Sequence, residues 1–303
     1  MKGIILAGGS GSRLHPLTTA IGKQLLPVYD KPMIYYPLSV LMQAGIRDIL
    51  IISTASDVPR FRALLGDGSQ VGIQLSYRVQ QDPNGIGEAL VIGAPFVATD
   101  PVALILGDNL FYGPHFSELL QASMARLDGC VLFGSHVDDA SHYGVARFGA
   151  DGHLEAIEEK PPGHHNGLAI TGLYMYENGV LELARELRPS ARGELEITDI
   201  NNEYVKQGRA DLFDLGDGFT WLDTGTFDAL LDAASFVRTI QHRHGLHPGC
   251  IEETALDLGY ITAEQCVELG RRMPNSAYGA YVASLPSQRG PSEGTDPFYS
   301  GSQ

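Results

Sequence analysis

Residues 2–14 of the chain read KGIILAGGSGSRL, an apolar run that ends in three glycines and then Arg13. A second basic residue, Lys23, follows ten residues after Arg13. Glycines between a strand and a helix let backbone N–H groups approach a phosphate closely. The stretch therefore predicts an α/β fold whose first strand leads into an anion-binding turn.

The same alternation of strand and helix patterns continues over the first 135 residues. Apolar runs predict strands at 4–7, 48–53, 73–77, 102–106 and 130–135. Helical patterns lie between them at 33–44, 58–65, 87–92 and 116–127. Such alternation is typical of a Rossmann-like, mainly parallel central sheet flanked by helices. We therefore expect residues 1–135 to form the first part of a main α/β domain that spans 1–245.

Shorter segments of alternating polarity follow at 144–148, 154–158 and 169–176, and they predict an antiparallel extension over 136–245. Helical patterns return at 180–187, 196–207 and 227–242. Short helices at 252–258, 262–271 and 277–285 predict a C-terminal helical element over 246–286. Residues 287–303 are rich in Ser, Gly and Pro, and we expect a disordered tail there.

The composition excludes several classes of protein. The chain has 36 acidic residues against 21 basic ones, a formal net charge of −15, which argues against nucleic-acid binding. No apolar run has the roughly 20 residues that a membrane helix needs, and none resembles a signal peptide, so a cytoplasmic location is expected. The three cysteines have no zinc-site spacing. An anionic substrate would need a local cluster of cations or a metal ion.

Three kinds of phosphate-binding loop were compared with the first turn. A P-loop requires Gly-Lys followed by Ser or Thr, which the chain lacks. A dinucleotide fingerprint requires GxGxxG, and Leu14 stands where the third glycine belongs. The third pattern matches: GGSGSRL at 8–14 is followed by KQLLP at 23–27 and DKP at 30–32. In these motifs the chain resembles the sugar-1-phosphate nucleotidyltransferases.

The resemblance covers residues 1–285 and is strongest to members that use dTTP. It continues through MIYYPLSVLMQAGIRDILIIST (33–54), LGDN (106–109), YGV (143–145), EEKP (158–161), ITGLY (170–174), SARGELEITD (190–199) and WLDTGT (221–226). It implies that glucose 1-phosphate attacks the α-phosphorus of dTTP, giving dTDP-glucose and pyrophosphate. It also implies a homo-oligomer, a tetramer in many members.

The resemblance assigns roles to five charged residues. Arg13 and Lys23 match the residues that contact the nucleotide phosphates, and Lys160 matches the one that meets the sugar phosphate. Asp108 and Asp223 match the Mg²⁺ ligands. Two carboxylates together with substrate phosphates are a usual set of ligands for Mg²⁺. Charge stabilisation of this kind needs no side-chain nucleophile.

The resemblance further implies a set of substrate-binding residues. Gln80 and Gly85 match the positions that read the base, Glu159 would accept hydrogen bonds from the sugar, and Trp221 would pack so as to place Asp223. The full set comprises Gly8, Gly9, Gly11, Ser12, Gln24, Gln80, Gly85, Asn109, Tyr143, Gly144, Glu159, Ile170, Thr171, Gly172 and Trp221.

Some positions depart from the family pattern. Glu88 stands where an amide is usual, and Gly167 and Leu168 replace an Asn-Tyr pair. Asp257 replaces an arginine of the second, feedback-inhibitory site, which predicts weakened feedback. These departures leave open a different sugar 1-phosphate, or UTP in place of dTTP. A non-catalytic subunit that senses sugar phosphates is a further alternative, against which the retained Arg13 argues.

Overall fold

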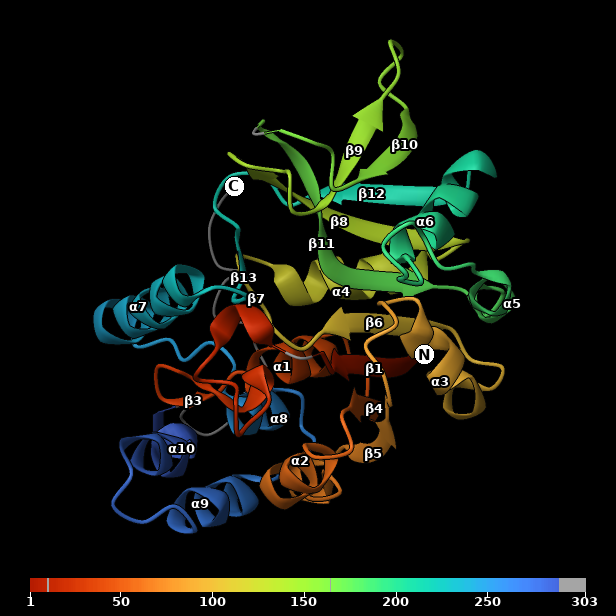
Figure 1. Cartoon of the computed structure of the whole chain (residues 1–303). Coiled ribbons are helices and arrows are strands. Elements are labelled where there is room, and N and C mark those ends of the chain that lie inside the picture. Colours follow the sequence, from red (N-terminus) through yellow and green to blue (C-terminus); the bar gives the residue numbers. More distant parts are fainter. Residues whose placement is uncertain (10, 164, 289–303) are drawn as a thin grey trace. The chain divides into compact units, whose positions relative to one another are not determined.

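The computed structural model describes residues 1–9, 11–163 and 165–288 (Figure 1). The chain divides into two compact units, Met1–Ile251 and a second that begins at Glu252. In the described part no helix is both long and apolar enough to cross a membrane.

The parallel half of the central sheet contains β1 (Lys2–Ala7), β4 (Asp48–Ser53), β5 (Gln74–Val79) and β6 (Val102–Leu106), in the order β6-β1-β4-β5. All three strand pairs are parallel. β1, β4 and β6 were predicted as strands covered on both faces, because their apolar residues are consecutive. β5 was predicted from the run at 73–77.

Helices pack on both faces of this parallel half. Leu41 of α1 (Tyr35–Gln43) lies against Gly3, whereas Gly93 of α3 (Glu88–Val97) lies against Ile4. Neighbouring residues of a strand point to opposite faces, so α1 and α3 lie on opposite sides of β1. α2 (Val58–Leu65) packs on β5. α3 continues beyond its predicted end and includes Pro95.

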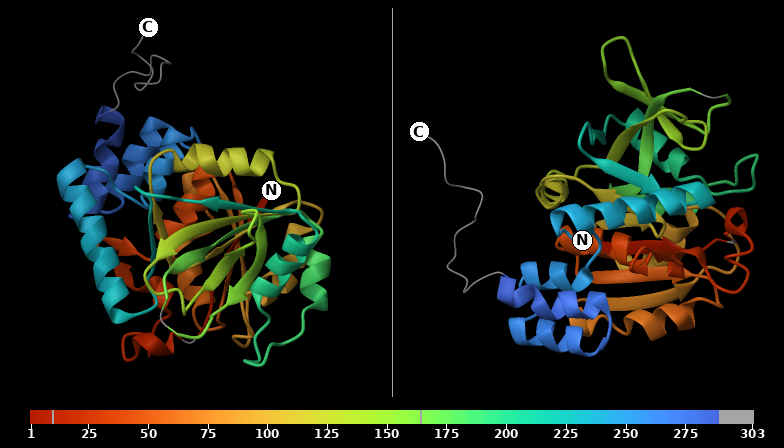
Figure 2. Two further views of the ribbon diagram at one scale, coloured as in Figure 1. Left: turned by 90° about the horizontal axis from the view of Figure 1, so that it is seen from above. Right: turned by 90° about the vertical axis from the view of Figure 1, so that its left-hand side faces the viewer.

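The antiparallel half is organised around the long strand β11 (Gly167–Tyr176). β11 pairs antiparallel with β6, with β8 (Cys130–Val137) and with β9 (Gly144–Phe148). β10 (Leu154–Glu159) pairs with β9, and this hairpin projects from the end of the sheet (Figures 1 and 2). The predicted mixed α/β class, with its antiparallel extension, is confirmed.

Several short elements were not predicted. β7 (Asn109–Tyr112) and β13 (Thr220–Asp223) form a separate antiparallel ribbon. β12 (Ala210–Asp214) pairs parallel with β8, and β2 (Pro27–Val28) pairs with β3 (Lys31–Pro32). The described residues also include 3₁₀ helices at Ser12–Leu14, Lys23–Leu25 and Ser69–Val71.

The remaining helices of the first unit follow the predicted pattern closely. They are α4 (Phe116–Ala125), α5 (Val180–Glu186), α6 (Ile197–Lys206) and α7 (Phe227–His244). One buried core cluster joins α3, α5 and α6 to β1, β6 and β11, and it includes Ile4, Leu104 and Tyr176. This core fixes the ends of the strands where the site described below is built.

The C-terminal helices are α8 (Ile251–Asp257), α9 (Ala263–Arg271) and α10 (Ala277–Gln288). Thr262 begins α9 with a capping box, because its side chain accepts from the Gln265 N–H while the Gln265 side chain accepts from the Thr262 N–H. α10 extends two residues into the segment predicted as a tail. The rest of that predicted tail, 289–303, lies outside the described residues.

Candidate active site

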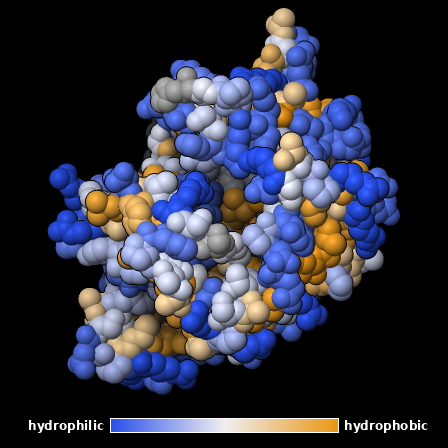
Figure 3. Space-filling model, viewed as in Figure 1, coloured by the Kyte–Doolittle hydropathy of each residue, from blue (hydrophilic) through white to orange (hydrophobic). Residues whose placement is uncertain are grey.

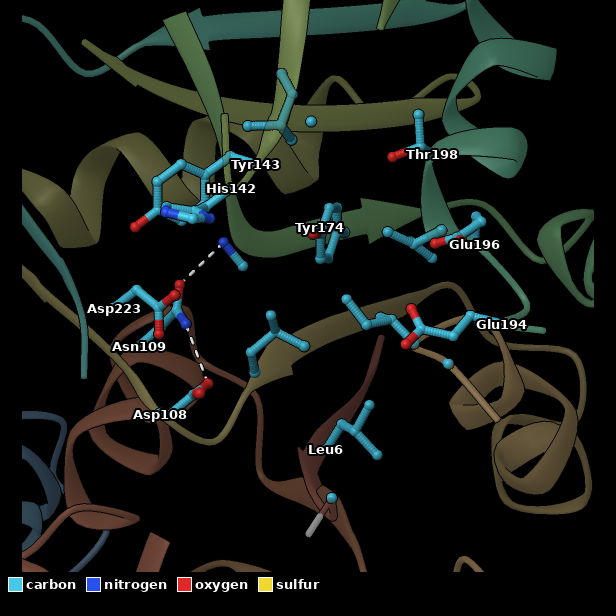
Figure 4. Close-up of a pocket in the computed structure, with 18 of the residues that line it drawn as sticks. Leu6, Asp108, Asn109, His142, Tyr143, Tyr174, Glu194, Glu196, Thr198 and Asp223 are labelled. Atoms are coloured by element: carbon cyan, nitrogen blue, oxygen red, sulfur yellow. Dashed lines mark hydrogen bonds between the residues drawn. The ribbon is translucent and has the colours of Figure 1, made fainter. Parts of the chain in front are cut away.

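A cavity of about 400 Å³ opens at the carboxyl ends of the parallel strands (Figures 3 and 4). Gly8 follows β1, Gln80 follows β5 and Asp108 follows β6, and all three line the cavity. Ligands of open α/β sheets bind at this edge, because the loops after parallel strands meet there. The cavity lies wholly within the first unit.

Most of the residues predicted for the site line this one cavity. They are Gly8, Gly9, Arg13, Lys23, Gln24, Gln80, Gly85, Asp108, Asn109, Tyr143, Gly144, Glu159, Lys160, Ile170, Gly172, Trp221 and Asp223.

Three predicted residues, Gly11, Ser12 and Thr171, are not among the lining residues. The Thr171 side chain is fully buried in β11, between Ile170 and Gly172, which do line the cavity. Alternation along a strand turns its side chain to the other face.

Other lining residues were not predicted as site residues: Leu6, Pro83, Ile86, Leu106, His142, Tyr174, Glu194, Glu196, Ile197, Thr198 and Asn201. Glu194, Glu196 and Thr198 belong to the motif SARGELEITD, for which the sequence predicted no individual roles. Figure 4 shows these three on the side of the cavity opposite Asp108 and Asp223, with Tyr174 between the two groups.

The first turn adopts a glycine-dependent conformation. Gly9 has φ +95° and Gly11 has φ +58°, in the left-handed region that side chains disfavour. The Gly11 carbonyl accepts hydrogen bonds from Leu14 N (2.9 Å) and Thr18 Oγ1 (2.8 Å). Leu14 is fully buried, so it anchors the turn at the position where a dinucleotide fingerprint has glycine. The adjacent Arg13 stays exposed at the cavity.

The two cations of the turn are held differently. Lys23 begins a 3₁₀ helix and forms an ion pair with Asp108. Within the part of the chain that the structure describes, Arg13 forms no ion pair, which leaves its guanidinium available for a bound anion. A Cβ on Gly225 would lie 3.1 Å from Arg13 Nη2 and 3.2 Å from Asp223 Oδ1, so both groups converge on this glycine.

Pairing of β7 with β13 brings Asp108 and Asp223 together. Asp223 stands opposite Asn109 in this ribbon, and Asn109 follows Asp108 directly. Thr224 donates to the Asp108 carbonyl from its N–H (3.1 Å) and from its Oγ1 (2.8 Å). Figure 4 shows Asp108, Asn109 and Asp223 grouped at one side of the cavity.

The two carboxyl groups have opposite pKa shifts. Burial would raise the pKa of Asp108, but the Lys23 ammonium and hydrogen bonds hold it below its usual value. Burial, with the nearby charge of Asp108, raises the pKa of Asp223 to about 6, despite the opposing effect of Lys23 and Arg13. The site therefore holds more negative charge than its own cations neutralise.

These residues fit a divalent cation. Asp223 Oδ1 is buried and has no hydrogen-bond partner among the described residues. In the same part of the chain, no group of three or more His, Cys, Asp or Glu side chains is placed to hold a metal ion. The two aspartates would therefore need oxygen ligands from a substrate or from water, which is how Mg²⁺ is commonly held.

Asn109 connects Asp108 to β11 and β13. Its Oδ1 accepts from Trp221 Nε1 (2.6 Å) and from Gly172 N (3.0 Å), while its Nδ2 donates to Asp108 Oδ1 (3.2 Å). The Trp221 ring also packs edge-on against Tyr143, with centroids 5.0 Å apart. Trp221 thus orients Asn109 directly.

A second charged group surrounds Glu159 on the far side of the cavity. Glu159 accepts from Thr198 Oγ1, and its Oε1 lies 3.0 Å from Arg192 Nη2 and 3.5 Å from Lys160 Nζ. Lys160 has φ +45°, an uncommon conformation for a residue with a side chain. Such strain is often found at ligand sites.

Asp57 fixes the segment that carries Lys23. The Asp57 side chain is buried, and its carboxylate accepts from Gly22 N (3.2 Å), Arg60 Nη1 (2.7 Å) and Thr54 Oγ1 (3.0 Å). Gly22 directly precedes Lys23. The position of Lys23 in the site therefore depends on a carboxylate that does not line the cavity.

We predict that Asp57→Ala raises the KM for an anionic substrate bound at Lys23 about tenfold, because Gly22 N loses its partner and Lys23 shifts. The effect on kcat should be smaller. Steady-state kinetics with the concentration of that substrate varied measure both constants. Asp48→Ala, which removes a partly exposed ion pair with Lys2, is the matched control and should leave both unchanged. Equal kinetics in the two variants would exclude this role for Asp57.

The sequence matches a known family over most of its length. The family model described as nucleotidyl transferase matches residues 2–240. A glucose-1-phosphate thymidylyltransferase of Mycobacterium tuberculosis is 52% identical over 94% of this chain and 99% of its own length. One from Neisseria meningitidis is 50% identical with the same coverage.

A solved structure shows the same similarity. A Bacillus anthracis protein assigned as a glucose-1-phosphate thymidylyltransferase, in complex with sucrose, aligns with a TM-score of 0.73 and 40% sequence identity. The alignment covers 78% of this chain and 95% of that one.

Proposed function

The chain belongs to the nucleotidyl transferase family, and on that premise we propose that it transfers the thymidylyl group of dTTP to α-D-glucose 1-phosphate, forming dTDP-glucose and pyrophosphate. One observation above all supports this reaction. The available guanidinium of Arg13, the ammonium of Lys23 and the carboxylates of Asp108 and Asp223 line one cavity. That combination suits a triphosphate bound together with a divalent cation.

In this reaction a phosphate oxygen of the sugar phosphate forms a new bond to the α-phosphorus. The bond from that phosphorus to the α–β bridging oxygen breaks, and pyrophosphate leaves with the bonding electrons. The attacking oxygen is already anionic, so no general base is required. The remaining obstacle is the repulsion between two anions and the charge on the α-phosphoryl oxygens.

The residues of this chain would reduce that obstacle by position and charge. The amides of the glycine turn and Arg13 would hold the β- and γ-phosphates, since a planar guanidinium suits phosphate oxygens. Lys23 would exchange its contact with Asp108 for one with the triphosphate. Lys160 would hold the sugar phosphate, and Glu159 would accept hydrogen bonds from the sugar hydroxyls.

We propose Mg²⁺ as the cofactor, held by Asp108 and Asp223 together with phosphate oxygens. When bound, this ion would neutralise phosphate charge during transfer. Asp223 Oδ1 is buried without a hydrogen-bond partner in the described part of the chain, and the pKa of Asp223 is raised; both observations support the assignment. By family resemblance we further propose that the chain assembles as a homotetramer.

The proposal predicts a specific pattern of pyrophosphate release. The measurement uses a matrix of dTTP, UTP and dCTP against glucose 1-phosphate and other sugar 1-phosphates, with Mg²⁺ or with EDTA. We expect the largest kcat/KM for dTTP with glucose 1-phosphate, and no release in EDTA. A different preferred pair would correct the substrate within the same class of reaction. Binding of sugar phosphate without release in any combination would instead identify a sensing subunit.

A further inference from the structure

The motif DKP at 30–32 has no role in the reaction described so far, and none of its residues lines the cavity. Its lysine is nevertheless buried, since Lys31 is only 3% exposed. The Lys31 ammonium lies 2.6 Å from Asp30 Oδ1 and 5.3 Å from the centre of the Tyr36 ring. A buried ammonium is unfavourable unless such contacts hold it. The ion pair therefore fixes the conformation of the β2–β3 hairpin, in which it lies.

The base of this hairpin is hydrogen-bonded to the turn that carries Lys23. Met33 N, directly after β3, donates to the Leu26 carbonyl (2.9 Å), and Ile34 N donates to the Gln24 carbonyl (2.9 Å). Gln24 belongs to the same 3₁₀ helix as Lys23. A shift of the hairpin would therefore move the Lys23 ammonium.

The tip of the hairpin is bonded to the last turns of α7. Asp30 Oδ2 accepts from Gln241 Nε2 (3.0 Å), and Tyr29 Oη lies 3.0 Å from His242 Nε2. Val28 of β2 is fully buried in one cluster with apolar residues of α7. The Asp30 carboxylate thus binds the Lys31 ammonium with one oxygen and α7 with the other.

α7 in turn follows the segment that carries Asp223, which lies just before the first residue of the helix. The hairpin also reaches this segment directly, because Met33 Sδ lies 3.2 Å from Thr224 Oγ1. The hairpin therefore connects the turn that carries Lys23 with the segment that carries Asp223.

We propose that Asp30 and Lys31 are positioning residues, which dock the hairpin on α7 and thereby set the place of Lys23 relative to Asp223. This inference rests on the proposed function, in which both groups act on one triphosphate, Lys23 directly and Asp223 through the metal ion. Asp30 and Lys31 themselves do not touch the substrate. A displacement of about 1 Å in a binding group is enough to cost about 10²-fold in rate.

The variant that tests this role is Lys31→Met, which removes the ammonium and keeps most of the volume of the side chain. Asp30 then loses its cation, and its partly exposed carboxylate can turn to water. We expect the Kd for dTTP, measured by calorimetry with Mg²⁺, to rise about tenfold, and kcat to fall about tenfold or more. The KM for glucose 1-phosphate should stay unchanged, since Lys160 and Glu159 lie on the far side of the cavity.

Lys2→Met is the matched control. Lys2 also forms an ion pair with an aspartate, Asp48 (2.7 Å), and its ammonium also lies over an aromatic ring, 5.0 Å from the centre of Phe96. Lys2 begins β1, whereas the cavity opens at the carboxyl end of that strand. The control should retain the wild-type Kd and kcat.

A double-mutant cycle separates positioning from general damage to the fold. If Lys31 acts through Lys23, Lys31→Met should no longer change the Kd in the Lys23→Ala background. Loss of folded protein would instead lower the number of binding sites in both backgrounds and leave the Kd unchanged. If Lys31→Met does not fold, Gln241→Met replaces it, because it removes only the contact of Asp30 with α7. It should raise the Kd about threefold, again only where Lys23 is present.

The outcomes separate this proposal from the proposed function. A rise in Kd for Lys31→Met that is absent in Lys2→Met and disappears in the Lys23→Ala background supports positioning through Lys23. A wild-type Kd in the hairpin variant that folds overturns it, as does a rise that persists in full without Lys23. A wild-type protein that binds dTTP but transfers nothing refutes the proposed reaction, while its Kd values still test the role of Asp30 and Lys31.

Discussion

Asp223→Asn is expected to lower kcat/KM by at least about 10²-fold while making the metal-free protein more stable at neutral pH. The loss of activity follows from removing one of two carboxylates proposed to hold the divalent ion. The gain in stability follows from the raised pKa of Asp223, about 6 against an ordinary value of 3.8, which burial and the charge of Asp108 cause.

The raised pKa of Asp223 determines how the free energy of unfolding changes with pH. A carboxyl group with a raised pKa in the folded state favours folding below its unfolded pKa, and this contribution is lost as the pH rises through about 6. The asparagine variant does not titrate there. The free energy of unfolding of Asp223→Asn minus that of the wild type should therefore grow by about 1–3 kcal/mol between pH 4 and pH 7.5.

Denaturant unfolding at several pH values in EDTA measures this difference. Asp232→Asn, at an exposed position of α7 in the same unit, is the control and should show no such pH dependence. Added Mg²⁺ should stabilise the wild type more than Asp223→Asn, a result that does not depend on turnover. If Asp223→Asn is less stable than the wild type at every pH, the charge of the buried Asp223 carboxylate does not destabilise the metal-free protein, and the prediction is wrong.

Lys23→Ala is expected to lower kcat/KM by at least about 10²-fold, as Asp223→Asn does, but to make the protein less stable. Lys23 and Asp108 form an ion pair in which both side chains are mostly buried, 15% and 11% exposed. Removal of one partner of such a pair leaves a buried charge and costs about 3–5 kcal/mol. The pKa of Asp108, which Lys23 holds below its usual value, should rise toward neutrality in the variant.

Differential scanning calorimetry and kinetics test this prediction together. Lys206→Ala, which removes a well-exposed lysine from α6, is the control and should leave both measurements unchanged. The opposite stability changes of Lys23→Ala and Asp223→Asn distinguish charge balance in the site from general damage to the fold. If the two variants are equally destabilised, the charges of Lys23 and Asp223 do not have the opposite effects on stability that we predict.

The extent to which sequence predicts this structure depends on how local each signal is. The strands Asp48–Ser53 and Val102–Leu106 have the predicted bounds, because each is a continuous apolar run between polar or turn residues. β7 and β13 have only four residues each and end in polar side chains. They are strands because they pair with each other across a long sequence separation, and no local pattern contains that information.

The residues of the candidate site likewise divide into those with a local sequence signal and those placed by tertiary packing. The residues in the quoted motifs gather in one cavity because they stand at strand ends. Thr171 was included, with Ile170 and Gly172, for a backbone contact to the sugar ring, and strand alternation turns its side chain out of the cavity. Glu196 and Thr198 reach the site through the packing of α6 beside β10, a tertiary arrangement that the motif does not encode.

The β7–β13 ribbon also has a consequence for the order of events during synthesis. Asp108 leaves the ribosome long before Asp223, and the two meet only when β13 docks onto β7. Closing so long a loop is entropically unfavourable until other contacts support it. A nascent chain that ends before residue 220 therefore lacks the second carboxylate of the proposed metal site, however well its first strands have folded.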